Sequence, residues 1–367
     1  MSQAIQKTLR DSAAMRWTAL LLLALAMFCS YIFMDILSPI KDLMQETRGW
    51  DSTAFGTMQG AEVFLNVFAF FLIFAGIILD KMGVRFTAVL SAVVMLVGAC
   101  IKWYAVSDGF IGSGLETWFT NNLNYIPGFD ELGVSPFYQG MPASAKFAAC
   151  GFMIFGCGCE MAGTTVSKIL AKWFKGKEMA LAMGLEMAIA RLGVFAAMWL
   201  SPMISERFAV NGTNSVTAPL LFASLLLVIG LLNFFVFTVM DTRFDNQLVA
   251  IGEATAVKDP EDEFHVSDLG QIFRSKMFWI VALLCVLYYS AIFPFQRFAT
   301  NFLEETLQIS NAEAAGLFKW FPILAMVLTP FLGAFIDYKG KGASMMLLGA
   351  VIMTLCHLVF AFVLPAF

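Results

Sequence analysis

The chain has 367 residues, of which 59% are hydrophobic and 14% are charged. Soluble domains carry about 45–50% apolar and about 25% charged residues, so a soluble enzyme is nearly excluded. The 23 basic residues are outnumbered by 27 acidic ones, which leaves no basic surplus for binding nucleic acid. This composition indicates a membrane protein whose surroundings are the lipid bilayer.

Nine stretches are long and apolar enough to cross a bilayer, which takes about 20 residues. Their approximate bounds are 17–38, 56–79, 86–106, 147–170, 180–204, 217–240, 277–298, 312–336 and 343–365. We therefore expect an all-α membrane protein. We expect six spans within an N-terminal segment over 1–241, a polar linker over 242–274 and three spans within a C-terminal segment over 275–367.

The distribution of lysine and arginine sets the expected orientation, because cytoplasmic loops carry the excess of these residues. If the N-terminus lies in the cytoplasm, the outer segments hold only Lys41, Arg48, Lys102, Lys146 and Arg207. In this orientation Glu62 lies near the outer end of the second span, where we expect its carboxylate to meet water.

A short motif occurs twice, each time between two spans on the predicted cytoplasmic side. The first copy contains Gly76, Asp80, Gly83 and Arg85, and the second contains Gly333, Asp337 and Gly340 at a constant offset. Gly83 permits a tight turn, and Arg85 supplies a partner charge. Repeated halves related by an axis along the membrane normal are typical of transporters, although a simple structural turn with orienting charges is the alternative.

This motif resembles the G-x-x-x-D-[RK]-x-G-x-[RK] loop of the major facilitator superfamily. The second copy departs from it, because Gly342 stands where the last basic residue belongs. Other short segments are similar to one branch of this superfamily, which is named after major facilitator superfamily domain-containing protein 1. That branch includes a lysosomal dipeptide transporter and bacterial relatives. The similar segments are Trp173-Phe-Lys-Gly-Lys-Glu178, Ala190-Arg-Leu-Gly193 and Tyr288-Tyr289 before Phe293-Pro-Phe295.

The resemblance implies a major facilitator fold that works by alternating access. It also implies a gating role for Gly76, Asp80, Gly83, Arg85 and Asp337. The superfamily has twelve spans in two bundles of six. The nine spans here would form the first bundle and three helices of the second, as in a chain truncated at its C-terminus.

Two opposite charges lie deep in adjacent spans, where an unpartnered charge costs at least about 2.5–3.5 kcal/mol. Glu160 precedes the cytoplasmic end of the fourth span and Arg191 follows the cytoplasmic start of the fifth. At about 1.5 Å per residue, each lies roughly 20 Å from that boundary. We predict that Arg191 binds a carboxylate and Glu160 an amino group, as the resemblance also implies; a buried structural ion pair is the alternative.

Three further residues are weaker candidates for contact with a substrate. Asp35 lies in the outer third of the first span and could serve as a gate, a proton carrier or a polar helix end. Tyr288 and Tyr289 fall near the middle of the seventh span. They could contact substrate from the second bundle, and packing is an equal alternative for them.

The fourth span also contains glycines and cysteines whose role is packing or metal binding. The spacing of Cys157 and Cys159 matches neither a disulfide framework nor a zinc site, so no metal is predicted. We expect close helix contacts at three small residues, namely Gly156, Gly158 and Gly163.

No enzyme constellation or phosphate-binding loop is present, so neither enzymatic activity nor a cofactor is predicted. The energy source is then a substrate gradient or a coupling ion, for which a proton is a candidate. The favoured function is transport of dipeptides or similar zwitterions. The alternatives are an organic anion carrier and a non-transporting membrane receptor or assembly partner. We favour the bacterial inner membrane, or the lysosomal membrane for a eukaryotic protein.

Overall fold

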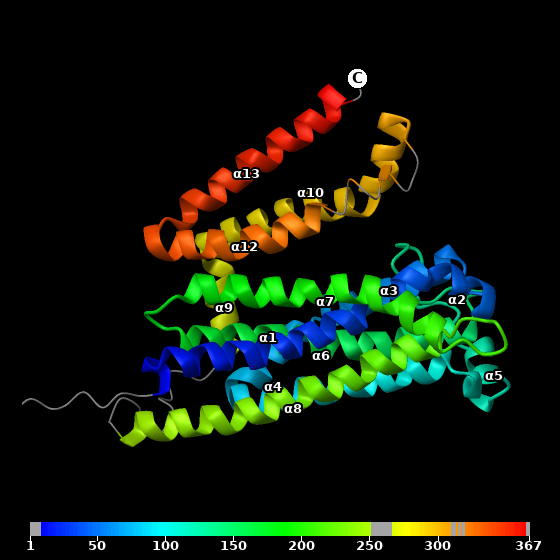
Figure 1. Ribbon diagram of the computed structural model, residues 1–367, viewed down its shortest axis with the longest axis horizontal. Coiled ribbons are helices and arrows are strands. Elements are labelled where there is room, and N and C mark those ends of the chain that lie inside the picture. The colour runs from blue at the N-terminus through cyan, green and yellow to red at the C-terminus, as the bar shows by residue number, and fades with distance from the viewer. Residues whose placement is uncertain (1–8, 251–265, 310–312, 315–316, 318–319, 365–367) are drawn as a thin grey trace, which may run out of the picture. The chain divides into compact units, whose positions relative to one another are not determined.

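The computed structural model describes residues 9–250, 266–309, 313–314, 317 and 320–364. The chain divides into two compact units, Met1–Glu261 and Asp262–Phe367. Regular structure in the described residues is helical, apart from one isolated bridge between Val210 and Thr213 (Figure 1).

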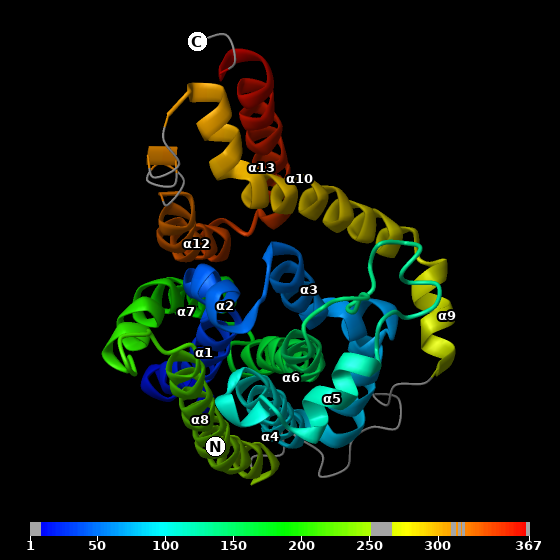
Figure 2. The same cartoon turned by 90° about the vertical axis from the view of Figure 1, so that its right-hand side faces the viewer.

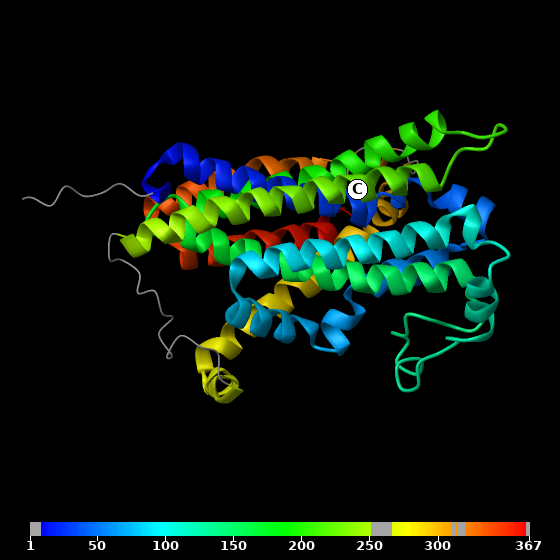
Figure 3. The same cartoon turned by 90° about the horizontal axis from the view of Figure 1, so that it is seen from below.

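The long helices of the first unit run side by side along the bundle (Figure 3). Short helices and a long loop connect them at one end. The helices are α1 (Ala13–Asp35), α2 (Lys41–Arg48), α3 (Ser52–Phe68), α4 (Phe71–Val106), α5 (Gly114–Asn121), α6 (Ala143–Trp173), α7 (Met179–Arg207) and α8 (Thr217–Ala250).

The centre of this unit is α6, which lies between α3 and α4 (Figure 2). On the other side of the bundle, α1 packs against both α7 and α8. Small residues allow the closest approaches: a Cβ atom added at Gly158 would lie 2.7 Å from the Ser91 carbonyl oxygen of α4. A Cβ atom at Gly156 would collide with the backbone of α3, whereas one at Gly163 would have no neighbour within 4 Å. Close packing at Gly156 and Gly158 is therefore confirmed, and the same expectation for Gly163 is wrong.

Two backbone irregularities change the predicted pattern of spans. The expected span 56–79 is interrupted between α3 and α4, where Phe70 has a left-handed conformation with a φ of 51°. Gly83 bends α4 with a φ of 79° and a ψ of 166°, as the motif predicts for this glycine. Non-glycine residues seldom adopt a positive φ, so the break at Phe70 could not be expected from its residue type.

Among the described residues, six helical segments are long and apolar enough to span a membrane. They are Ala13–Arg48, Phe71–Val106, Ala143–Trp173, Met179–Arg207, Thr217–Ala250 and Gly342–Val363. The prediction of nine spans, with six in one bundle and three in the next, is not confirmed. The expected span 312–336 lies partly outside the described residues.

The long loop between α4 and α6 is folded against the helices that it connects. Lys146 of α6 is buried, and its Nζ donates to the carbonyl oxygens of Phe119 and Asn122 at 3.1 and 3.2 Å and to Oδ1 of Asn124 at 2.8 Å. Arg48 donates through Nε to the Val106 carbonyl oxygen at 2.8 Å. These bonds satisfy the buried Lys146 and the partly buried Arg48, and they fix the loop at that end of the bundle.

The second unit contains α9 (Val266–Arg274), α10 (Lys276–Leu307), α12 (Trp320–Lys339) and α13 (Gly342–Leu358), followed by a π-helical turn over Val359–Val363. Large apolar side chains here are widely exposed; Phe331 is 70% exposed and Phe362 is 74% exposed. Exposed large apolar side chains in such number are typical of contact with lipid or with other protein segments.

Candidate functional site

The two predicted substrate anchors lie on α6 and α7, and Tyr31 of α1 is close to both. Tyr31 interacts electrostatically with Glu160, with Arg191 and with Glu186. Gly193 explains the close approach of α1 to α7, because a Cβ atom there would lie 2.5 Å from the Phe28 carbonyl oxygen. The fold therefore places Glu160 and Arg191 around one tyrosine, although α6 and α7 have little contact with each other.

Glu160 and Arg191 do not pair with each other. In the described part of the chain, neither side chain forms a hydrogen bond or an ion pair with another residue. Glu160 is half-buried and Arg191 is exposed. The structural ion pair named above as the alternative is thus not the arrangement found here.

A second group of charges lies where α1, α3, α4 and α6 meet. Lys102 of α4 is completely buried, and its Nζ lies 3.4 Å from the centroid of the Phe152 ring. This ammonium group interacts electrostatically with Asp35 and Glu62. The expectation that Glu62 meets water is wrong, since the residue is only 9% exposed.

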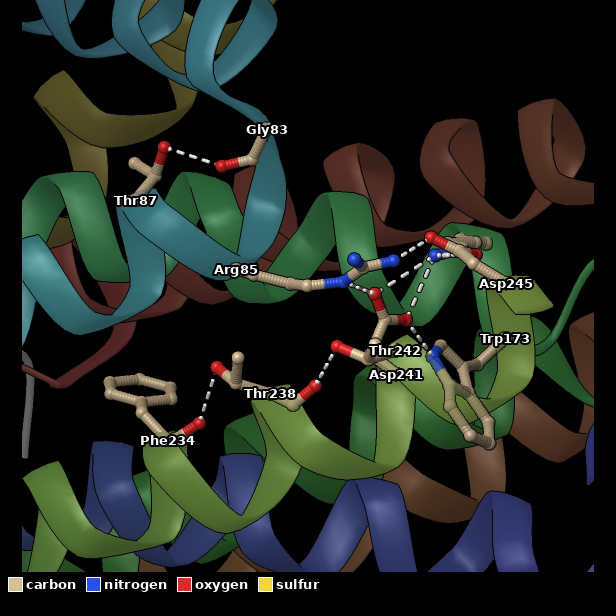
Figure 4. A network of polar contacts seen from close by, with 10 residues as sticks. Gly83, Arg85, Thr87, Trp173, Phe234, Thr238, Asp241, Thr242 and Asp245 are labelled. Carbon is tan, nitrogen blue, oxygen red and sulfur yellow. Dashed lines mark hydrogen bonds and ion pairs between the residues drawn. The ribbon is translucent and has the colours of Figure 1, made fainter. Parts of the chain in front are cut away.

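The motif residue Arg85 belongs to a network at the predicted cytoplasmic end of the bundle (Figure 4). Its Nε lies 2.9 Å from Oδ2 of Asp241, and its guanidinium also pairs with Asp245. Lys172 of α6 approaches Asp241 at 2.8 Å and Asp245 at 2.7 Å, and Trp173 Nε1 donates to Asp241 at 2.9 Å. Asp241 is fully buried, so one carboxylate joins α4, α6 and α8.

The other motif residues take separate places. Asp80 pairs with Lys168 of α6, and Gly83 forms the bend in α4. A Cβ atom at Gly76 would have no neighbour within 4 Å, so space does not require glycine there. Asp337 lies on α12 in the second unit, close in sequence to Gly340, which has a φ of 64°.

Tyr288 and Tyr289 also belong to the second unit, on α10. Their rings pack edge to face with centroids 5.4 Å apart, and both are about half exposed. The aromatic pair is therefore accessible within its own unit.

Sequence reasoning missed the acceptors of the Arg85 network and the burial of Lys102. Asp241 and Asp245 are four residues apart on α8, a spacing that places both carboxylates on one helix face. That spacing at the end of a span was the available signal. The distribution of lysine and arginine places Lys102 in an outer segment, although this residue lies within an apolar stretch where a charge needs a partner.

This chain is similar to proteins from several animals that share one name. Lysosomal dipeptide transporter MFSD1 of Gallus gallus is 26% identical over 220 residues, which cover 58% of this chain and 47% of that protein. The proteins of the same name from Danio rerio and Homo sapiens are 27% and 24% identical over 220 residues, covering 58% of this chain and 45% of each relative. The chain thus spans about half the length of the curated relatives it matches.

A family model provides the broader assignment. The model described as Major Facilitator Superfamily matches residues 23–367, which is most of the chain. This match agrees with the long apolar helices of the structure. The chain therefore belongs to the Major Facilitator Superfamily of multi-pass membrane transporters.

Proposed function

We propose that this protein carries dipeptides or similar small zwitterions across a membrane by alternating access. Arg191 binds the carboxylate of the cargo, because its planar guanidinium matches a carboxylate through two parallel hydrogen bonds. Glu160 binds the amino group at the other end. The names of the similar proteins support a dipeptide as cargo.

The observation that carries this proposal is the pair of opposite charges that face the same tyrosine without pairing. Glu160 and Arg191 both interact with Tyr31, and in the described residues neither forms an ion pair. A charge inside a membrane needs a partner or a watery cavity. A zwitterion supplies both missing partners at once. Asp35, Tyr288 and Tyr289 are proposed as additional contacts.

The gate is proposed to lie at the motif, where Gly76, Asp80, Gly83 and Arg85 connect α4 to its neighbours. Arg85 and Asp80 hold α8 and α6 respectively, so release of these pairs frees one end of the bundle. Asp337 is proposed for the equivalent position of the second unit. Cargo promotes the exchange between states only if it binds them with different affinity.

Substrate counterflow in proteoliposomes tests the proposal with the full-length protein. Arg191→Ala should reduce counterflow of alanyl-alanine more than about tenfold, because it removes charge-assisted hydrogen bonds worth roughly 1.5–3 kcal/mol. Arg207→Ala is the matched control, since Arg207 is an exposed arginine at the end of the same helix. Wild-type counterflow in Arg191→Ala and in Glu160→Gln would refute the assignment of these residues.

An organic anion carrier is the second candidate, favoured by the greater exposure of Arg191 than of Glu160. In that case the carboxylate alone is recognised. N-acetyl-alanyl-alanine should then compete as well as alanyl-alanine, whereas a zwitterion carrier discriminates against the blocked peptide. For either cargo we propose the bacterial inner membrane as the location, or the lysosomal membrane if the protein is eukaryotic.

A further inference from the structure

Three polar side chains around α3 and α4 are buried without hydrogen-bond partners. Among the described residues, this is true of Oε1 of Glu62, both amide atoms of Asn66 and Nζ of Lys102. Glu62 and Asn66 are 9% and 6% exposed, and Lys102 is completely buried. Buried polar groups are almost always satisfied, so such a concentration calls for a physical explanation.

Glu62 lies on a face of α3 that is close to other charged groups. Glu62 and Asn66 are four residues apart and share one face of α3. The backbone of α3 touches α6 at Gly156, where no Cβ atom would fit beside Glu62. The charged and titratable groups facing Glu62 come from three helices: Asp35 of α1, Lys102 of α4, and Cys157, Cys159 and Glu160 of α6.

Among the described residues, carboxylates outnumber cations around Glu62. Lys102 is the cation that interacts with Glu62 there, and the carboxylates of Asp35 and Glu160 interact with it as well. An ionised carboxylate that is buried without a hydrogen-bond donor is costly, and like charges nearby add to the cost. A proton on Glu62 removes one negative charge from a buried carboxylate whose Oε1 has no hydrogen-bond partner among the described residues.

We infer that Glu62 is a proton-binding site of this carrier, and that the proton competes with the cationic end of the cargo. The inference rests on the proposed function, because it uses Glu160 as the anchor of the ammonium group. When that group reaches Glu160, the local negative charge falls. The O–H bond of the Glu62 carboxylic acid then breaks, its electron pair stays on the carboxylate, and the proton passes to water.

Reciprocal linkage makes this exchange measurable. If cargo binding expels a proton, then protons must weaken cargo binding by the same coupling free energy. Binding should release up to about one proton per cargo molecule. The affinity for cargo should rise by up to about tenfold for each unit by which the pH increases, within the pH range over which Glu62 titrates.

Calorimetry of the full-length protein in detergent tests the inference. Alanyl-alanine is titrated in two buffers that differ in protonation enthalpy, and the difference gives the number of protons released. Wild type and Glu46→Gln should release protons; Glu46 is the matched control because it is an exposed glutamate on α2. Glu62→Gln should bind alanyl-alanine with no proton release. Equal proton release in Glu62→Gln and wild type would overturn the inference.

Infrared spectroscopy separates failure of this inference from failure of the proposed function. Absence of alanyl-alanine binding to wild type would contradict the dipeptide proposal alone. The ligand-free protein still reports the proton site through the carbonyl stretch of a protonated carboxyl group near neutral pH. That band should weaken in Glu62→Gln and persist in Glu46→Gln. An unchanged band in Glu62→Gln would show that Glu62 carries no proton.

Discussion

At the scale of single residues, buried carboxylates are used in two ways in this protein. Asp241 is fully buried and accepts from Arg85, Lys172 and Trp173. Glu62 is buried and has one oxygen with no partner among the described residues. The free-energy cost of burying a charge distinguishes the two cases. A buried carboxylate surrounded by hydrogen-bond donors stabilises a single arrangement, whereas a buried carboxylate without donors is best suited to change its protonation.

Asp241→Asn should therefore destabilise the protein strongly. Removing one partner of a buried ion pair costs roughly 3–5 kcal/mol, because the cations that remain lose their compensation. Thermal unfolding of the purified protein should show a clear fall in Tm. Asp245→Asn is the matched control, since its side chain is 37% exposed and the same cations contact it. A Tm loss no larger than that of Asp245→Asn would contradict the central role of Asp241.

At the scale of helices, the closest contacts between two helices form at glycine residues, which carry no side chain. Gly156 and Gly163 are both on α6, and they differ only in what faces them. The backbone of α3 lies against Gly156, while a Cβ atom at Gly163 would have open space.

Gly156→Ala should lower Tm, because the added methyl group forces α3 away from α6. Gly163→Ala should leave Tm unchanged or raise it, since alanine favours a helix over glycine by about 1 kcal/mol. Both variants can be compared by thermal denaturation in the same detergent. Equal destabilisation by the two substitutions would refute the packing described for α3 and α6.

Sequence patterns predicted local features better than distant partners. The motif predicted the turn at Gly83 because glycine tolerates a positive φ, and apolar runs predicted helices. The break at Phe70 carries no such residue signal. The acceptor of Arg85 could not be read from the motif either, because Asp241 lies far along the chain and only packing of α4 on α8 brings it close.

The same limit applies to the candidate site. Rules for charges in a membrane singled out Glu160 and Arg191, but α1 was not expected to come between α6 and α7 and present Tyr31 to both. Orientation rules placed Glu62 in water, because they consider position along a span and ignore the direction of a helix face. Contact with α6 at Gly156 decides its burial instead.

At the scale of the whole molecule, transport requires binding and a change of state, and different residues should control each. Arg85→Ala should lower counterflow severalfold while leaving dipeptide affinity nearly unchanged, because its partners Asp241 and Asp245 belong to the proposed gate. Binding by calorimetry and counterflow in proteoliposomes measure the two quantities separately. A parallel loss of affinity in Arg85→Ala would show that the network belongs to the binding site.

The most direct test of the central claim combines modified cargo with modified anchors. Affinities of alanyl-alanine, its N-acetyl derivative and its C-terminal amide are measured for wild type, Glu160→Gln and Arg191→Ala. Blocking the amino group should weaken binding of the peptide to wild type, whereas Glu160→Gln should bind the blocked and the free peptide with similar affinity. Blocking the carboxylate should weaken binding to wild type in the same way, and Arg191→Ala should not distinguish the amide from the free peptide. Penalties that remain equally large in the variants would show that neither residue holds the ends of the cargo.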